Sequence, residues 1–279
     1  TMSIVKRLNQ KTGETIATVG FPFDAQSSFL QGPAEAPPLI REAVFSPSAN
    51  TWSETGVDVA APGHILDLGD VPLTNTAEDF NEIEETISQI VNWDLAPLSL
   101  GGDHSITYPL VKAFMAKYPD LQILHLDAHP DLYDELNGNR MSHACPFARI
   151  MEHGVVRRLV QVGIRTINGH QRAQADRFGV EVHEVKLGLA DLPLSFDGPL
   201  YISFDMDVLD PAFAPGVSHQ EPGGLSIREA IDLIHRIEGH IVGMDLVELN
   251  PRRDPSGITA MAAGKIYKEM AARLIIQHR

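Results

Sequence analysis

Short apolar runs that end in glycine, aspartate or histidine alternate along the chain with longer segments of helical period. This alternation is typical of βα units built around a mostly parallel sheet. No internal repeat, low-complexity stretch or long polar linker interrupts it, so we expect one α/β domain over residues 1–279. Met2 in second place suggests that Thr1 is left over from expression. The predicted strands are 16–20, 64–68, 97–100, 121–126, 159–163, 180–185, 200–204 and 241–247, and the predicted helices are 77–93, 105–117, 169–178, 226–237 and 259–276.

Charge and cysteine content limit the classes of partner and compartment. The formal net charge of −15 argues against binding to nucleic acid or to an anionic membrane, because such polyanions would be repelled. The single cysteine, Cys145, excludes an internal disulfide and any all-cysteine zinc site. No apolar run reaches the length of a membrane span, and the N-terminus lacks the layout of a signal peptide. We therefore expect a cytoplasmic protein.

Acidic and imidazole side chains follow two of the predicted strands at intervals of two residues. Asp127, His129 and Asp131 come directly after the run 121–126, and Asp205 and Asp207 follow the run 200–204. Side chains two residues apart on an extended strand point to the same side. In open parallel sheets, ligands bind outside the carboxyl ends of the strands. Any one of these residues alone is better explained as a loop-capping aspartate or a core histidine, but the set as a whole points to one crevice.

Two more predicted strands lead into His104 and Glu248 at the same edge. Carboxylates that converge beside a low-dielectric sheet repel one another and raise their pKa values unless cations compensate. Oxygen ligands outnumber nitrogen ligands and no thiolate is present, so Mn²⁺ suits the set better than zinc. Bridging carboxylates permit two ions about 3.5 to 4 Å apart. Such a cluster favours a cationic or neutral substrate over a phosphate.

Three segments resemble the signature blocks of the ureohydrolases, the arginase and agmatinase family. They are Gly-Gly-Asp-His-Ser at 101–105, Asp-Ala-His-Pro-Asp at 127–131 and Ser-Phe-Asp-Met-Asp-Val-Leu-Asp-Pro at 203–211. The likeness extends through residues 23–24, 32–41, 163–165, 223–225 and 244–251, so it covers almost the whole chain. It implies a three-layer α/β/α fold, a binuclear manganese centre, and hydrolysis of a guanidinium group to urea and an amine. It also suggests a homo-oligomer, either a trimer or a hexamer, although the segment 259–276 equally suits packing on its own sheet.

The resemblance also implies a role for each matched residue. One Mn²⁺ is held by His104, Asp127, Asp131 and Asp205, and the other by Asp127, His129, Asp205 and Asp207. Asp127 and Asp205 are then the bridging carboxylates, and the hydroxide derived from a shared water attacks the guanidinium carbon.

Three residues are matched to catalytic roles through the same resemblance. Asp131 is placed to hold that hydroxide and pass its proton to the leaving amine, and Glu248 pairs with the substrate guanidinium. His143 falls where the family keeps a histidine that shuttles protons near the mouth of the site. The alternative for His143 is an imidazole on a surface loop.

The choice of guanidino compound depends on the loops. Residues 131–134, 138–144 and 218–225 look like those of plant-type arginases, which favours conversion of L-arginine to L-ornithine and urea. On that likeness Asn139, Asn168 and His219 lie near the substrate tail or guanidinium, although each is equally well explained as a turn-forming loop residue. Agmatine, giving putrescine and urea, or another guanidino acid is the alternative substrate.

Two other classes of protein are alternatives to a ureohydrolase. Zinc amide hydrolases of the deacetylase type keep one metal and do not need His104 and Asp207, so the presence of both disfavours that class. A non-catalytic protein that retains the metal centre is the other alternative, and urea release separates it from an enzyme.

Overall fold

Eight parallel strands form one continuous sheet in a computed structural model that describes residues 4–278. Thr1, expected to be an expression remnant, lies outside the described residues. The strand order is β2-β1-β3-β8-β7-β4-β5-β6, and every pair of neighbours runs parallel. The strands are β1 (Ile16–Gly20), β2 (Ile65–Asp70), β3 (Ala96–Leu100), β4 (Gln122–Leu126), β5 (Arg158–Ile164), β6 (Glu181–Glu184), β7 (Ser195–Asp205) and β8 (Glu238–Val247). Each corresponds to a predicted strand.

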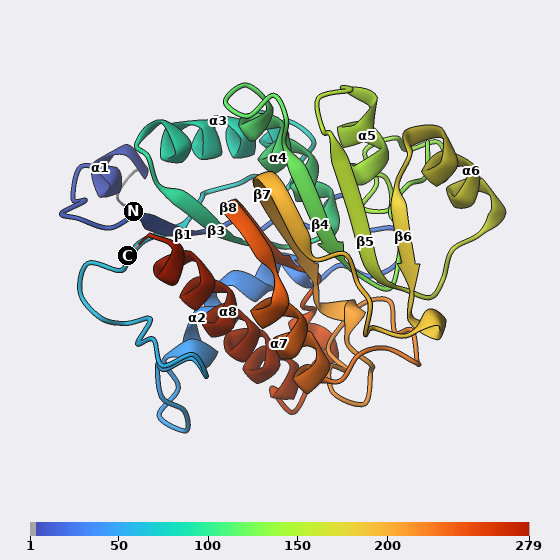
Figure 1. The fold of residues 1–279 in the computed structure, drawn as a ribbon. Coiled ribbons are helices and arrows are strands. Elements are labelled where there is room, and N and C mark those ends of the chain that lie inside the picture. Colours follow the sequence, from blue (N-terminus) through green and yellow to red (C-terminus); the bar gives the residue numbers. More distant parts are fainter. Residues whose placement is uncertain (1–3, 279) are drawn as a thin grey trace.

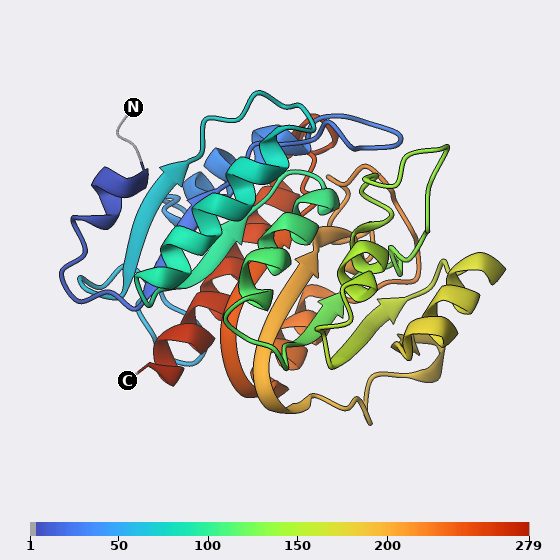
Figure 2. The same cartoon turned by 90° about the horizontal axis from the view of Figure 1, so that it is seen from above.

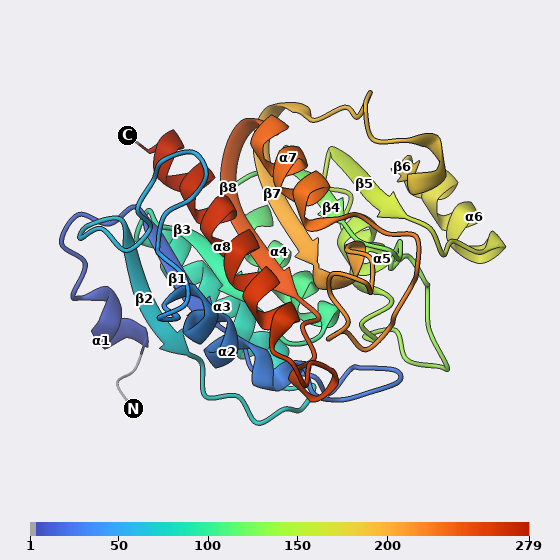
Figure 3. The ribbon, with the colours of Figure 1, turned by 90° about the horizontal axis from the view of Figure 1, so that it is seen from below.

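Helices cover both faces of the sheet and make three layers, which confirms the α/β/α arrangement (Figure 1). One layer holds α1 (Ile4–Leu8), α3 (Asp79–Asn92), α4 (Thr107–Met115), α5 (Pro146–Glu152) and α6 (Gly169–Phe178), and Figure 2 shows it from above. The opposite layer holds α2 (Ala36–Val44), α7 (Ile227–Arg236) and α8 (Ile258–Gln277), seen from below in Figure 3. Single 3₁₀ turns lie at Pro33–Glu35, His104–Ile106, Val185–Leu187, Met206–Val208 and Pro251–Arg253. Within residues 4–278, no helix combines the length and the apolar character needed to cross a membrane.

Three helices were not predicted, and proline explains two of them. The stretch around Pro37 and Pro38 looks irregular in the sequence, yet both prolines lie in the first turn of α2. Proline is tolerated there because the first-turn N–H groups have no intrahelical acceptor. Pro146 starts the short helix α5 in the same way. By contrast, α7 coincides with the predicted helix 226–237 and begins with a capping box between Ser226 and Glu229.

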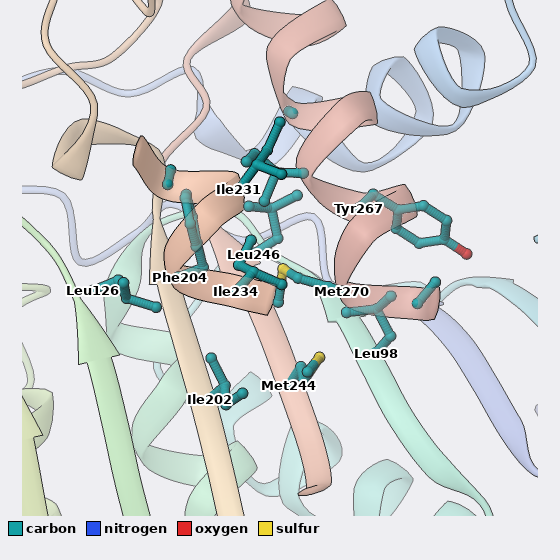
Figure 4. Close-up of a cluster of buried hydrophobic side chains, with 14 of the residues drawn as sticks. Leu98, Leu126, Ile202, Phe204, Ile231, Ile234, Met244, Leu246, Tyr267 and Met270 are labelled. Atoms are coloured by element: carbon teal, nitrogen blue, oxygen red, sulfur yellow. The ribbon is translucent and has the colours of Figure 1, made fainter. Parts of the chain in front are cut away.

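The core divides at the sheet because successive strand residues point to opposite faces. Leu126, Ile202 and Met244 point toward α7 and α8, where they meet Ile234 and Met270 (Figure 4). Fully burying one such side chain contributes about 1.5–3 kcal/mol to folding. The intervening residues face the layer of α3, α4 and α5, and several of these are polar.

Candidate metal centre

The seven strand-end residues predicted to form the site lie together at the carboxyl ends of four adjacent strands. These strands, β3, β8, β7 and β4, are the central four of the sheet. The residues are His104 after β3, Glu248 after β8, Asp205 and Asp207 at the end of β7, and Asp127, His129 and Asp131 after β4. The parallel order therefore brings residues more than 140 positions apart in the chain into one cluster.

The His104 ring faces three carboxylates. Its Nδ1 atom lies 3.1 Å from Oδ2 of Asp127, 3.1 Å from Oδ2 of Asp131 and 3.0 Å from Oδ2 of Asp205. The residue is 1% exposed, and Nδ1 has no hydrogen-bond partner within residues 4–278. A buried ring nitrogen surrounded by three carboxylate oxygens fits a divalent cation, because the cation would satisfy all four groups.

A second imidazole approaches Asp127 from its other oxygen. His129 Nδ1 lies 3.3 Å from Oδ1 of Asp127 and 3.0 Å from Oδ2 of Asp207. The ligand atoms of Asp127, His129 and Asp207 lie close enough together to hold one metal ion. Asp127 thus presents Oδ2 to His104 and Oδ1 to His129, as a carboxylate shared by two cations would.

The electrostatics of the cluster also favour cations. Burial raises the pKa of Asp205 well above its ordinary value, and the neighbouring charges of Asp207 and Asp127 raise it further. Burial likewise raises the pKa of Asp207 to about 6, against the opposing effect of His129. Burial disfavours a charge on His104, but the surrounding carboxylates raise its pKa well above 6.5. Two divalent cations would remove this mutual repulsion.

Unusual backbone geometry aims two of the site carboxylates. Asp131 has φ 50° and Glu248 has φ 65°, both in the left-handed region. For a residue other than glycine this conformation costs roughly 1–2 kcal/mol, and it persists where the surrounding structure fixes it. Gly102 is required nearby, because a Cβ atom there would lie 1.7 Å from the carbonyl oxygen of Phe23.

A cavity of about 250 Å³ opens onto the cluster. Its lining comprises Ser28, His129, Asp131, Tyr133, Leu136, His143, Ala144, Thr166, Asp205, Asp207, His219, Glu221 and Glu248. The volume lies below the range of about 300–1,000 Å³ that is usual for drug-sized ligands. The site therefore suits a small molecule that reaches the carboxylates at its floor.

His143 is buried beside Glu248 and is not a surface loop residue. Its Nδ1 atom lies 2.7 Å from Oε1 of Glu248, and its Nε2 atom accepts from the backbone N–H of Ser28 at 3.1 Å. Burial opposes a charge on the imidazole, yet the Glu248 carboxylate raises the pKa of His143 to about 9. The same ion pair keeps the pKa of Glu248 below its ordinary value despite burial.

The three residues predicted near the substrate tail are placed differently from one another. His219 lines the cavity, its ring centroid lies 5.3 Å from that of His143, and its Nε2 atom is buried without a partner among residues 4–278. Asn139 and Asn168 are not in the lining. Asn139 donates to Gln26 Oε1 at 2.8 Å. Asn168 caps α6 and donates to the hydroxyl of Tyr133, which does line the cavity.

Sequence reasoning assigned no role to four buried polar residues behind the cluster. Gln161, His125, Ser203 and Asp245 lie inside otherwise apolar strands, and each is 0% exposed. A polar residue two positions before a strand-end ligand, as in His125–Asp127 and Ser203–Asp205, is the signal that finds two of them.

Several plant arginases align with almost the whole chain. Arginase 1, mitochondrial, of Arabidopsis thaliana is 48% identical over 273 residues, which cover 92% of this chain and 80% of the relative. Arginase 2, chloroplastic/mitochondrial, of the same plant is 46% identical over 277 residues, with coverages of 93% and 80%. The structure of arginase from Medicago truncatula superposes with a TM-score of 0.91 at 42% identity, covering 97% of this chain and 93% of that one. The resemblance to ureohydrolases of the plant arginase type is confirmed.

The expectation of a cytoplasmic location is contradicted by these relatives, which are named as mitochondrial or chloroplastic/mitochondrial proteins. The expectation came from the single Cys145. One cysteine excludes an internal disulfide, but it does not distinguish one reducing compartment from another.

The family model described as "Arginase family" matches residues 14–272. That range contains all eight strands and every candidate ligand. On sequence, on fold and on the arrangement of its strand-end residues, this chain belongs to the arginase family.

Proposed function

We propose that this protein is a binuclear manganese arginase that hydrolyses L-arginine to L-ornithine and urea. The observation that carries the proposal is the unpartnered Nδ1 atom of His104, with three carboxylate oxygens 3.0–3.1 Å away. The high identity to two plant arginases supports the choice of substrate.

Each of two Mn²⁺ ions is assigned its own ligands. His104 and Asp131 would hold one ion, His129 and Asp207 the other, and Asp127 and Asp205 would be shared. When bound, the ions would lower the pKa of a water so that hydroxide is available near neutral pH.

Glu248 orients the guanidinium group. Its Oε1 atom already accepts from the backbone N–H of His104 at 2.9 Å and pairs with His143 Nδ1 at 2.7 Å. We therefore assign its Oε2 atom to the substrate, where a charge-assisted hydrogen bond would hold the planar guanidinium against the cluster.

Asp131 and His143 handle the protons. Asp131 lies at the floor of the cavity beside His104, where it can orient the attacking water and accept its proton. Asp131 then passes that proton to the leaving amine. His143 stands between Glu248 and the cavity, where its imidazole can relay protons near the mouth of the site.

Neutral groups hold the substrate tail in this proposal. His219 and Tyr133 line the cavity, and Asn168 acts on the tail through its hydrogen bond to the Tyr133 hydroxyl. Asn139 steadies the loop at Gln26. The surrounding net charge of −15 favours a cationic guanidino substrate over nucleic acid or an anionic membrane. We also propose a single domain over residues 1–279 and a homo-oligomer, either a trimer or a hexamer.

The test is urea release by the Mn²⁺-loaded protein with L-arginine, agmatine and several guanidino acids at matched concentrations. The matched control is Asp207→Asn, which removes one candidate ligand and leaves the cavity mouth intact. Urea from L-arginine with the native chain, and little with the variant, supports the proposal. Turnover of agmatine or a guanidino acid in preference to arginine overturns the substrate choice, and no urea from any of them favours a non-catalytic protein.

A further inference from the structure

A row of buried polar residues crosses five strands directly beneath the candidate metal ligands. Its members pair in register across neighbouring strands, so they form one straight row. They are Gln161 on β5, His125 on β4, Ser203 on β7, Asp245 on β8 and Ser99 on β3. None is more than 1% exposed. Burying a polar group without a hydrogen bond costs roughly 1–3 kcal/mol, so five such groups in the middle of a sheet call for an explanation.

The row lies on the same face of the sheet as the ligands. Because side chains alternate between faces, His125 and Ser203 share a face with Asp127 and Asp205, two residues further along each strand. That face is covered by α4 and α5, whose Phe147 stacks on His125 with ring centroids 3.8 Å apart. The same Phe147 ring lies edge-on to His104 at 5.4 Å.

One half of the row determines which ring nitrogen of His104 carries a proton. Asp245 Oδ2 accepts from the hydroxyls of Thr107 at 2.9 Å and Tyr201 at 2.8 Å. Its Oδ1 atom accepts from Ser203 Oγ at 2.7 Å. Because the hydroxyl proton of Ser203 points at Asp245, the Ser203 oxygen is left to accept from His104 Nε2, 2.9 Å away. This polarity places a proton on Nε2 and leaves Nδ1 as the ring nitrogen that faces the carboxylates and would bind a metal.

The other half determines the hydrogen bond that Asp127 receives from His125. The amide nitrogen of Gln161 donates to the carbonyl oxygen of Pro130 at 2.6 Å, which fixes how the amide is turned. The same nitrogen lies 3.0 Å from His125 Nδ1, so that ring nitrogen must accept. His125 therefore carries its proton on Nε2 and donates it to Asp127 Oδ2 at 2.7 Å.

We propose that this row is a positioning network that keeps a ring proton on Nε2 of both His104 and His125, so that His104 Nδ1 and the Asp127 carboxylate are the atoms presented to the metal. Ser203, Asp245 and Gln161 are then positioning residues, because they act through the two histidines. The inference rests on the proposed metal assignment and is independent of which guanidino compound is the substrate. Groups that orient a metal-bound histidine typically change metal affinity by about 10–100-fold when removed.

The first measurement locates the ring protons of the native chain. Histidine ¹⁵N spectra of the protein loaded with diamagnetic Cd²⁺ should show a slowly exchanging proton on Nε2 of both His104 and His125, with the metal on His104 Nδ1. Metal on Nε2 of His104, or a proton on Nδ1 of His125, overturns the network.

The second measurement compares Mn²⁺ affinity by calorimetry in three single variants. Ser203→Ala and Gln161→Leu each break one half of the row, and both should weaken binding by about 10-fold or more. Ser99→Ala is the matched control, because Ser99 lies in the same row but its hydroxyl has no hydrogen-bond partner within residues 4–278. It should bind Mn²⁺ within about twofold of the native chain, since no orienting contact is lost.

The outcomes separate this inference from the proposed function. If Ser203→Ala and Gln161→Leu bind Mn²⁺ as tightly as Ser99→Ala, the network is wrong and the metal assignment stands. If the native chain binds no Mn²⁺, both are wrong. Should one variant fail to fold, as judged by circular dichroism of the metal-free protein, the other variant and the native ¹⁵N spectrum still decide.

Discussion

His143 Nδ1 lies 2.7 Å from Glu248 Oε1, so the candidate proton donor and the candidate guanidinium partner form an ion pair before any substrate is present. Both side chains are almost fully buried, so water and salt screen the attraction between their charges less than in a surface ion pair. In the proposed function, a substrate guanidinium would therefore meet a carboxylate that is already fixed in position.

Glu248→Gln should lower the pKa of His143 from about 9 toward its ordinary value, because the carboxylate that raises it is lost. In the native chain the folded pKa exceeds the unfolded one, so the pair stabilises the fold below about pH 6.5, and this contribution is lost as the pH rises through about 9. Histidine NMR titration of the metal-free protein measures the shift. Glu221→Gln, which also lines the cavity, is the control and should leave the His143 titration unchanged.

The metal-free protein should become more stable as the pH falls through about 6. Burial and neighbouring carboxylates raise the pKa of Asp207 to about 6, so the folded state binds protons that the unfolded state releases. Saturating Mn²⁺ should flatten this dependence and raise the melting temperature, with a gain of about 2.7 kcal/mol at 100 times the Kd.

Thermal unfolding between pH 5 and 8, with EDTA and with Mn²⁺, checks this expectation. Asp207→Asn should reduce the pH slope in EDTA. A metal-free protein whose stability rises with pH over this window would contradict the repulsion described above.

Tyr133→Phe and Asn168→Ala should both raise the KM for L-arginine, because Tyr133 lines the cavity and its hydroxyl accepts from Asn168 Nδ2 at 2.6 Å. Only Asn168→Ala should also lower stability, by about 1 kcal/mol, because it removes the cap of α6. Steady-state kinetics and melting curves separate the two effects. If Asn168→Ala melts earlier but keeps its KM, Asn168 is a helix cap without a role in binding.

Glu269→Gln should destabilise the fold by about 2 kcal/mol, since the fully buried carboxylate accepts from Lys265 and His235. Those contacts lower the pKa of Glu269 although burial opposes them, so its contribution is present above pH 4.5 and is lost as the pH falls below that value. Urea unfolding at pH 7 and pH 4 measures the difference between variant and native chain. Glu85→Gln is the control, because Glu85 is exposed and lies beyond the first turn of α3, and its free energy of unfolding should match that of the native chain.

The strands and the clustering of the candidate metal residues were predictable because both leave local signals. Apolar runs of strand length ended at Asp127 and Asp205, and the two-residue spacing placed the neighbouring ligands on one side. Helix α2 was not predictable in the same way, since Pro37 and Pro38 suggest an irregular segment unless the start of the helix is known.

The buried polar row behind the candidate ligands could not be predicted from the sequence, for a different reason. Gln161 and His125 come together only because β4 and β5 pair in one particular register, and a single sequence does not reveal that register. Likewise, nothing in the sequence shows that Asn139 reaches Gln26 while His219 reaches the cavity.

The ligand-bearing strands β3, β8, β7 and β4 occupy the middle of the sheet, and β2 and β6 form its edges. Central strands exchange their amide hydrogens only through the largest openings of a protein, whereas edges fray at low cost. Loosening at either edge therefore leaves the candidate catalytic residues assembled. On heating, we expect enzymatic inactivation to coincide with cooperative loss of the whole sheet, with no earlier stage in which the fold persists and the centre has come apart.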